Sequence, residues 1–330
     1  MSMVTLSLFM VSPTNCFARP IHVNKSLFLD REFSSYISHI NVSDENQVVI
    51  LSQNKGLIID FSSKRIEQEF DFSSCASPIS FFKNNEIYLL CTGRAFSSVW
   101  ARTKDDEVMW KLPEEMRPSV FISAYCPVEA VFYVGGMRGL HRIGPKGELQ
   151  LIGDETDITD IRFPEYSDGF HGLTLSKKSN FFNRAWVDFR GTDMTLISRT
   201  RINKNAKGLL NYGWPDKEVL LYYTGSRVHA INPKGEELGK VSIGHRAIRA
   251  EGAPIRIGNE TFFALIIGYS TTVRLESKLI ILDAAMEKVY EEALPRSWGF
   301  FVLPREEGDL LMIGEGTRHI YAYEIRIGGG

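Results

Sequence analysis

Short runs of β-forming residues, each broken by glycine or by a polar turn, recur along the whole chain. One such unit begins with the apolar run at residues 131–134, breaks at glycine, and continues with a second run at residues 139–143. Alternating or short continuous apolar runs bounded by turn residues predict β-strands. Convincing helical periodicity is absent over any stretch of twelve residues or more. We therefore expect an all-β protein built from hairpins.

Two stretches, at residues 131–153 and 219–244, repeat one pattern. Aligned without a gap, they share identities that lie 88 positions apart, namely Val131, His141, Pro145, Lys146, Gly147 and Glu148 with Val219, His229, Pro233, Lys234, Gly235 and Glu236. Repeats of 20 to 50 residues indicate solenoids or propellers, so we interpret this spacing as two units of about 44 residues. Pro-Lys-Gly suits a tight turn, because proline presets φ and glycine accepts a positive φ.

Other parts of the chain fit the same template with turns of different chemistry. The turns are expected to begin near residues 60, 103, 144, 188, 232 and 283, which implies an insertion in one unit around residues 268–276. In the unit between the two clear copies, we expect a strand at 185–188, a turn at 189–193 and a strand from 194 to 197.

The last unit, at residues 309–314 and 319–325, lacks its outer strand, whereas residues 21–29 form a strand-like run with no partner before it. An unpaired strand would expose hydrogen-bonding groups at an edge, so we expect the first run to complete the last unit. The prediction is a seven-bladed β-propeller of four-stranded antiparallel blades, formed by residues 21–330 as a single domain and closed by an N-terminal strand.

Residues 1–20 are interpreted separately. The apolar run at 3–11 and the small residue Ala18 resemble the second half of a secretory signal, but no lysine or arginine precedes the run. A signal peptide and a disordered N-terminus both stay open, and export to a periplasm or to the medium is favoured over a cytoplasmic location. The residues before Cys16 make a poor lipidation motif. We expect no transmembrane segment, because no apolar run is long enough to cross a bilayer.

The remaining cysteines, Cys75, Cys91 and Cys126, are odd in number and indicate no disulfide framework. Small buried apolar side chains are the simplest interpretation of all three. Cys75 and Cys91 could pair across a blade in an exported protein, and the sequence leaves this open.

The chain has 38 basic and 40 acidic residues, a formal charge of −2, which argues against nucleic acid as a partner, although a local patch could survive the average. Basic residues alternate along 199–204, where a strand is expected to run into a loop. We interpret them as a solvated edge that discourages aggregation, with a site for a polyanion as the alternative.

We assign no catalytic, cofactor-binding or metal-binding residue and expect no cofactor. The histidines (His22, His39, His141, His171, His229, His245 and His319) form no HxH or HExxH motif, and the shared repeat position of His141 and His229 predicts a structural role. Four carboxylates, on Asp154, Glu155, Asp157 and Asp160, could bind a cation. Because they lack the glycine of a calcium loop, we expect a solvated connection there.

Residues 98–111, SVWARTKDDEVMWK, resemble the repeat of quinoprotein-like (PQQ-like) propellers, and residues 282–290 are similar, with Tyr290 in place of tryptophan. WD-repeat propellers are a close alternative, although no Trp-Asp dipeptide closes a blade. Alcohol dehydrogenases of the PQQ-like family bind pyrroloquinoline quinone and calcium, use an aspartate base and have eight blades with regular tryptophan docking. Other members, such as the propeller lipoprotein of the outer-membrane assembly machinery, are noncatalytic scaffolds, and the resemblance implies that class. Trp110 and Tyr290 are expected to wedge between blades.

We therefore expect a noncatalytic scaffold that binds a protein or peptide partner through its loops and one face. The alternative is a propeller enzyme, a hydrolase or lyase, with a metal or histidine at the mouth of the central channel. Irregular segments are expected at residues 176–183 and 268–276, where recognition would be sought first.

Overall fold

The structure, a computed structural model, describes most of the chain from residue 21 onward. The described residues are 21–33, 35–43, 47–72, 75, 78–83, 86–91, 100–103, 107–111, 120–126, 129, 131–137, 139–144, 148–152, 157–163, 170–178, 184–216, 218–244, 247–270, 275–306 and 308–327. Residues 1–20, and with them the signal-peptide question, lie outside this set. No helix among the described residues is long and apolar enough to cross a membrane.

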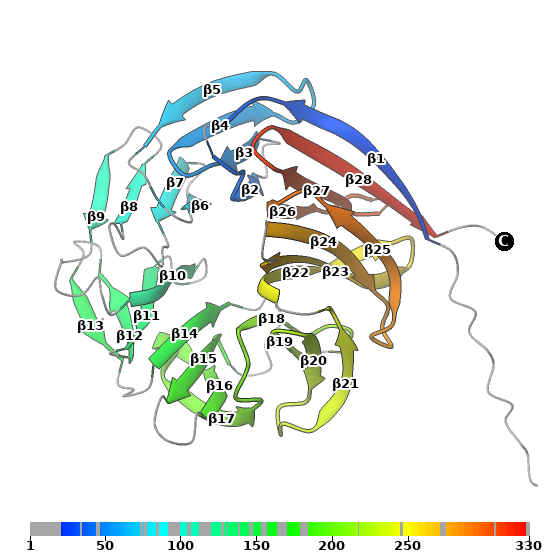
Figure 1. The fold of residues 1–330 in the computed structure, drawn as a ribbon. Coiled ribbons are helices and arrows are strands. Elements are labelled where there is room, and N and C mark those ends of the chain that lie inside the picture. The colour runs from blue at the N-terminus through cyan, green and yellow to red at the C-terminus, as the bar shows by residue number, and fades with distance from the viewer. Residues whose placement is uncertain are drawn as a thin grey trace, which may run out of the picture.

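Seven four-stranded antiparallel sheets lie around a ring, as Figure 1 shows. The first strand of each blade is nearest the ring axis and the fourth is outermost. Blades 1 to 4 are, in strand order, β2 (His39–Val42), β3 (Gln47–Leu51), β4 (Lys55–Asp60) and β5 (Ile66–Asp71); β6 (Pro78–Lys83), β7 (Glu86–Cys91), β8 (Trp100–Thr103) and β9 (Val108–Lys111); β10 (Val120–Cys126), β11 (Val131–Gly136), β12 (Gly139–Ile143) and β13 (Leu149–Leu151); and β14 (Asp157–Arg162), β15 (Gly172–Lys178), β16 (Arg184–Arg190) and β17 (Leu196–Ile202).

Blades 5 to 7 follow the same order. They are β18 (Gly208–Tyr212), β19 (Leu220–Tyr223), β20 (Arg227–Ile231) and β21 (Glu237–Ser242); β22 (Ala247–Ile257), β23 (Glu260–Ser270), β24 (Leu275–Leu282) and β25 (Lys288–Leu294); and β26 (Ser297–Leu303), β27 (Leu310–Glu315), β28 (His319–Ile327) and β1 (Ile21–Asp30). The predicted all-β propeller with seven four-stranded sheets is confirmed.

The N-terminal strand closes the ring. β1 pairs antiparallel with β28, in a register that places Ile21 opposite Ile327 and Val23 opposite Ile325 (Figure 1). The first and last strands of the fold thus satisfy one another's hydrogen-bonding groups. Without β1, β28 would be an unpaired edge. This confirms the closing strand that the sequence predicts.

The core lies between blades, because each sheet buries its faces against its neighbours. Trp110 on the outer strand of blade 2 is 4% exposed and packs edge to face on Phe132 of blade 3, with ring centroids 5.3 Å apart. Tyr290 on β25 packs against the cluster that contains Tyr323 of blade 7. Both aromatic residues therefore act as the predicted wedges between blades.

Five-residue turns join the third and fourth strands of several blades. In five of them the amide of the first residue donates to the carbonyl of the fifth, and three of these turns are described throughout: Gly191 to Thr195, Asn232 to Glu236 and Asp283 to Glu287. The fourth position has positive φ, at Met194 (58°), Gly235 (87°) and Met286 (64°). The predicted glycine is therefore present at 235, whereas methionine adopts the same conformation in two other blades. Residues 145–147 lie outside the described set.

The expected turn near 188 is wrong by three residues. β16 continues to Arg190, and its turn contains the 3-10 helix η2 (Thr192–Met194). Asp188 has no exposed surface, and its carboxylate accepts hydrogen bonds from Arg190 (3.2 Å) and Arg199 (2.6 Å). Sequence spacing ended the strand at this aspartate, but β16 continues for two more residues, and the Asp188 carboxylate is bonded inside the sheet by Arg190 and Arg199.

In the two segments expected to be irregular, the residues that the structure describes lie in strands. β15 extends to Lys178, and β23 and β24 together cover residues 260–270 and 275–282. The insertion expected around 268–276 is accommodated by long strands, because β22 and β23 each contain 11 residues. Residues 179–183 and 271–274 lie outside the described set.

Candidate functional site

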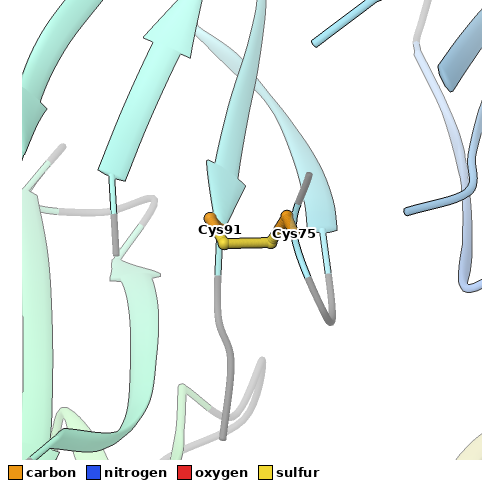
Figure 2. Close-up of a disulfide and its surroundings, with 2 residues drawn as sticks. All are labelled: Cys75 and Cys91. Carbon is orange, nitrogen blue, oxygen red and sulfur yellow. A yellow bond between two sulfur atoms is a disulfide. The ribbon is translucent and has the colours of Figure 1, made fainter. Parts of the chain in front are cut away.

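Cys75 and Cys91 form a disulfide, shown in Figure 2. Cys75 precedes β6 and Cys91 ends β7, and their Cα atoms are 5.7 Å apart. Both are buried, and the amide of Cys75 donates to the carbonyl of Gln53 at 2.8 Å. The pairing that the sequence left open is therefore made, and it fixes the passage from blade 1 to blade 2.

The ring has two faces that differ in which connections they carry. The crossover face carries the passages between blades and the connections between second and third strands, including residues 203–207 and 224–226. The turn face carries the other two connections of each blade, including residues 191–195 and 232–236. The disulfide lies at the crossover face.

A solvent-open hollow of about 590 Å³ lies on the crossover face where blades 4 and 5 meet. We call it the basic hollow; its lining is Lys177, Asn203, Lys204, Asn205, Ala206, Lys207, Thr224, Gly225, Ser226 and Arg227. Four of these described residues are basic and none is acidic. The remaining lining offers amide and hydroxyl groups, which donate hydrogen bonds to anions.

The loop that forms one wall of the hollow is held by its own hydrogen bonds. The side-chain oxygen of Asn203 accepts the amide of Asn205 at 2.9 Å, and the amide of Ala206 donates to the carbonyl of Asn203 at 2.9 Å. Ala206 is fully buried, and the amide of Lys207 donates to Tyr223 at 2.8 Å. Asn and Ala thus turn the chain while the two lysines beside Ala206 stay exposed.

The positive charge of the hollow is poorly balanced. Lys204, Lys207 and Arg227 make no ion pair with any described residue, although the Lys207 ammonium donates to the carbonyl of Ala247 at 2.5 Å. The acidic residue closest in the strand pairing is Asp157, which is opposite Lys177. Elsewhere on the same face cations are paired, as Arg318 is with Asp30.

The basic segment 199–204 divides between the two interpretations that its sequence allowed. Arg199 is committed to Asp188 within blade 4, and Arg201 is an exposed residue on the outer strand β17. Lys204, in contrast, lines the hollow. The solvated edge is therefore present along β17. A site for an anion is available only after β17 has ended, where Lys204 lines the hollow.

The inner strands carry a second group of charges, around the ring axis. Asp160 on β14 is buried, and its carboxylate accepts the amides of Ile161 (2.9 Å) and Leu209 (2.8 Å). Burial raises the pKa of Asp160. On β22 the guanidinium of Arg249 donates to the carboxylate of Glu251 at 3.0 Å.

These contacts correct the expectation for the four carboxylates. Asp157 and Asp160 lie in β14 rather than in a solvated connection, and Asp154 and Glu155 lie outside the described residues. Asp160 joins the inner strands of blades 4 and 5 through the Leu209 amide, which is a structural role. The sequence missed this because the spacing of acids does not reveal which one faces a neighbouring strand.

His229 has the structural role that its repeat position predicts. It stacks on Tyr222 with ring centroids 4.9 Å apart, and its Nδ1 lies 3.3 Å from the Glu237 carboxylate. Burial lowers the pKa of His229. His141 occupies the equivalent third position of β12.

Cys126, Glu129 and His171 meet on the turn face between blades 3 and 4, and sequence analysis missed them as a group. The Cys126 sulfur lies 3.1 Å from His171 Nε2, which lies 3.3 Å from a Glu129 oxygen. A Cys-x-x-Glu spacing is a weak signal, and His171 follows 45 residues later, so the cluster exists only through the packing of two blades.

Large exposed apolar side chains do not gather on one face of the described structure. They are spread over the outer strands of different blades, at Leu27, Val108, Leu151, Leu196, Ile197 and Leu238, with Met137 in a connection. Isolated apolar residues of this kind are normal on protein surfaces.

No protein-family profile matches the chain, and a search of the curated proteins finds no match. The fold of the described residues is a β-propeller, without assignment to a propeller family.

Proposed function

We propose that this propeller is a noncatalytic binding protein that holds an acidic segment of a partner protein in the basic hollow. The observation that carries the proposal is a hollow lined by Lys177, Lys204, Lys207 and Arg227 with no acidic lining residue among those described. Placing several cations together raises the local positive potential, so an anion that enters relieves their mutual repulsion.

The shape of the hollow favours an extended chain. It is solvent-open and bordered by residues of two blades, so a segment can lie across it without being enclosed. Aspartate and glutamate accept charge-assisted hydrogen bonds from lysine and arginine, while Asn203 and Ser226 offer neutral polar contacts to the backbone of the segment. A rigid ring then presents these groups without reorganising, which reduces the entropic cost of binding.

Two further proposals accompany this function. The buried disulfide supports export, because disulfides persist in oxidising compartments. Kinship with quinoprotein-like scaffolds is supported by the Trp110 wedge alone and is proposed on that basis.

The binding experiment uses a fluorescein-labelled eight-residue peptide with four glutamates and a matched peptide with glutamine at those positions. Fluorescence anisotropy should show that the protein binds the glutamate peptide at least tenfold more tightly. Lys204→Glu and Arg227→Glu should each weaken that binding about tenfold, because each replaces attraction by repulsion in the hollow.

Lys234→Glu is the matched control. Lys234 is exposed in the turn of the same blade but on the opposite face, so its reversal changes net charge equally and leaves the hollow intact. Equal weakening by Lys234→Glu would reduce the effect to general electrostatics and overturn the proposal. Tighter binding of a single-stranded oligonucleotide than of the peptide at the same site would assign the hollow to nucleic acid instead.

The enzyme alternative has less support. The Cys126 sulfur and His171 Nε2 are within reach of each other, but the cysteine has no exposed surface for a substrate to approach. The Arg249–Glu251 pair and the bonded Asp160 carboxylate occupy the inner strands as mutually satisfied groups.

A further inference from the structure

Three side chains of different chemistry converge on the turn face, away from the basic hollow. Cys126 is the last residue of β10, Glu129 lies in the connection to β11, and His171 precedes β15 in the next blade. One ligand atom from each lies within 4.8 Å of the other two. Thiolate, imidazole and carboxylate are the three donor types that zinc binds in proteins.

Two of the three distances between donor atoms are close to those around a tetrahedral ion. Cys126 Sγ to His171 Nε2 is 3.1 Å, and His171 Nε2 to Glu129 Oε1 is 3.3 Å. Metal–ligand distances of about 2.0–2.3 Å place the ligands of tetrahedral zinc about 3.3–3.6 Å apart. A small relaxation of the cysteine and histidine therefore suffices to admit the ion between the three donors.

Outer contacts hold the donors in place. The hydroxyl of Tyr133 donates to Glu129 Oε2, and the amide of Asp193 donates to Oε1 at 3.2 Å. Tyr133 is fully buried beside this carboxylate, so water does not compete for its hydroxyl. The His171 amide donates to the carbonyl of Arg190 at 2.5 Å. Such outer contacts are typical of metal sites, whose ligands are oriented by second partners.

A catalytic cysteine–histidine arrangement fits the same atoms less well. In a nucleophilic triad the acid orients the histidine through the ring nitrogen that does not face the nucleophile. Here the sulfur and the carboxylate both face Nε2, so they converge on one point instead of forming a relay. The sulfur is also fully buried, whereas His171 and Glu129 keep 19% and 13% of their side-chain surface exposed.

We propose that Cys126, Glu129 and His171 form a zinc site that joins blade 3 to blade 4, with water as the fourth ligand. The thiolate and the carboxylate neutralise the two charges of Zn²⁺, and the thiol proton is released to solvent as the metal binds. Magnesium and calcium prefer all-oxygen sites, so the sulfur and nitrogen donors select against them. This proposal is independent of the basic hollow and of its partner.

The experiment uses the full chain, stripped with a chelator and handled under inert gas without reductant, so that Cys126 stays a thiol while the Cys75–Cys91 disulfide stays closed. Titration with ZnCl₂ by calorimetry should give one ion per chain. Titration with CoCl₂ should give the charge-transfer band of a cobalt–thiolate bond and the strong visible absorption of tetrahedral cobalt. Glu129→Gln and His171→Asn should each weaken zinc binding at least about 100-fold, and Tyr133→Phe about tenfold, since loss of an outer partner alone has an effect of that size.

His229→Asn is the matched control. His229 also lies 3.3 Å from a glutamate, Glu237, but no cysteine is among the described residues that contact this pair. This variant should leave zinc affinity unchanged. Cys126→Ser changes a buried core residue. If this variant does not fold, Glu129→Gln still tests the site, because it is nearly isosteric and changes a partly exposed residue. Zinc affinity that is equal in wild type, Glu129→Gln and His171→Asn would overturn the proposal, as would a cobalt spectrum without a thiolate band.

Discussion

Cysteine occurs at two places in the ring, and its neighbours give it a different chemistry at each. On the crossover face Cys75 reaches Cys91 and closes a covalent link at the passage from blade 1 to blade 2. On the turn face the sulfur of Cys126 reaches an imidazole beside a carboxylate, between blades 3 and 4. The comparison shows that burial alone does not define a cysteine, since all three are almost inaccessible.

The two places should therefore respond to opposite reagents. A reductant acts on the disulfide and a chelator on the metal site, because one link is a sulfur–sulfur bond and the other depends on an ion. The ligands that we propose for the two faces differ as well, an anion in the basic hollow and a cation at the Cys126 cluster.

The largest effect is expected at the disulfide. Replacing both Cys75 and Cys91 by alanine should lower the free energy of unfolding by about 3 kcal/mol, because the cross-link closes a loop of 16 residues and restricts the unfolded chain. Urea denaturation measures the difference. Reductant should destabilise wild type by a similar amount and leave the double variant unaffected; equal sensitivity of the two proteins would contradict the pairing.

Zinc should come next. At a free concentration of about 100 times its Kd, a ligand that binds only the folded chain adds about 2.7 kcal/mol to the free energy of unfolding. Thermal unfolding with zinc and with chelator, under inert gas and without reductant so that the disulfide stays closed, measures the increment. It should persist in the Cys75→Ala/Cys91→Ala background, since distant sites contribute additively, and should vanish in His171→Asn. Loss of the increment in the disulfide variant would show that the two places are coupled.

Salt should separate the two faces. Raising ionic strength from 0.05 to 0.5 M should weaken binding of the glutamate peptide roughly tenfold, because the hollow's charges are exposed and screened. Zinc affinity, measured in a buffer that does not bind the metal, should change much less, since its ligands contact the ion directly. A salt-insensitive peptide complex would mean that the basic residues of the hollow do not hold it.

A smaller effect on stability is expected on an inner strand. Burial lowers the pKa of His39, on the inner strand β2, to about 4 from a usual value of 6.5. The unfolded chain therefore takes up the proton first as pH falls, so stability present above pH 6.5 is lost progressively between about 6.5 and 4. We expect a contribution of roughly 2 kcal/mol between pH 7 and 5, and His39→Gln should remove it. Urea midpoints across this range measure it, and an unchanged slope in the variant would contradict it.

Most of the fold could be predicted from local sequence patterns. The spacing of hydrophobic runs and turns predicted the seven sheets, and the lone run from Ile21 predicted the strand that pairs with β28. It ended the strand at Asp188, two residues too early, and it expected an irregular segment at residues 268–276, of which the described residues lie in β23 and β24. At Asp188 hydrogen bonds across the sheet, from Arg199, outweighed the local preference of the residues.

The candidate sites were less accessible to sequence analysis. Lys204 belonged to a basic segment that was noticed, but Lys177 and Arg227 come from other strands, and only the packing of blades 4 and 5 brings the three together. Glu129 carries no signal in the sequence, because a single acidic residue after a cysteine is common and His171 belongs to another blade.

The sequence by itself determined the number of hairpin units and the ring they form, because strand periodicity and turn chemistry act over a few neighbouring residues. Tertiary structure alone decided which cysteines pair, which lysines share a hollow and which histidine meets Cys126. Those contacts join residues in different strands and blades, and their distances depend on how whole sheets pack.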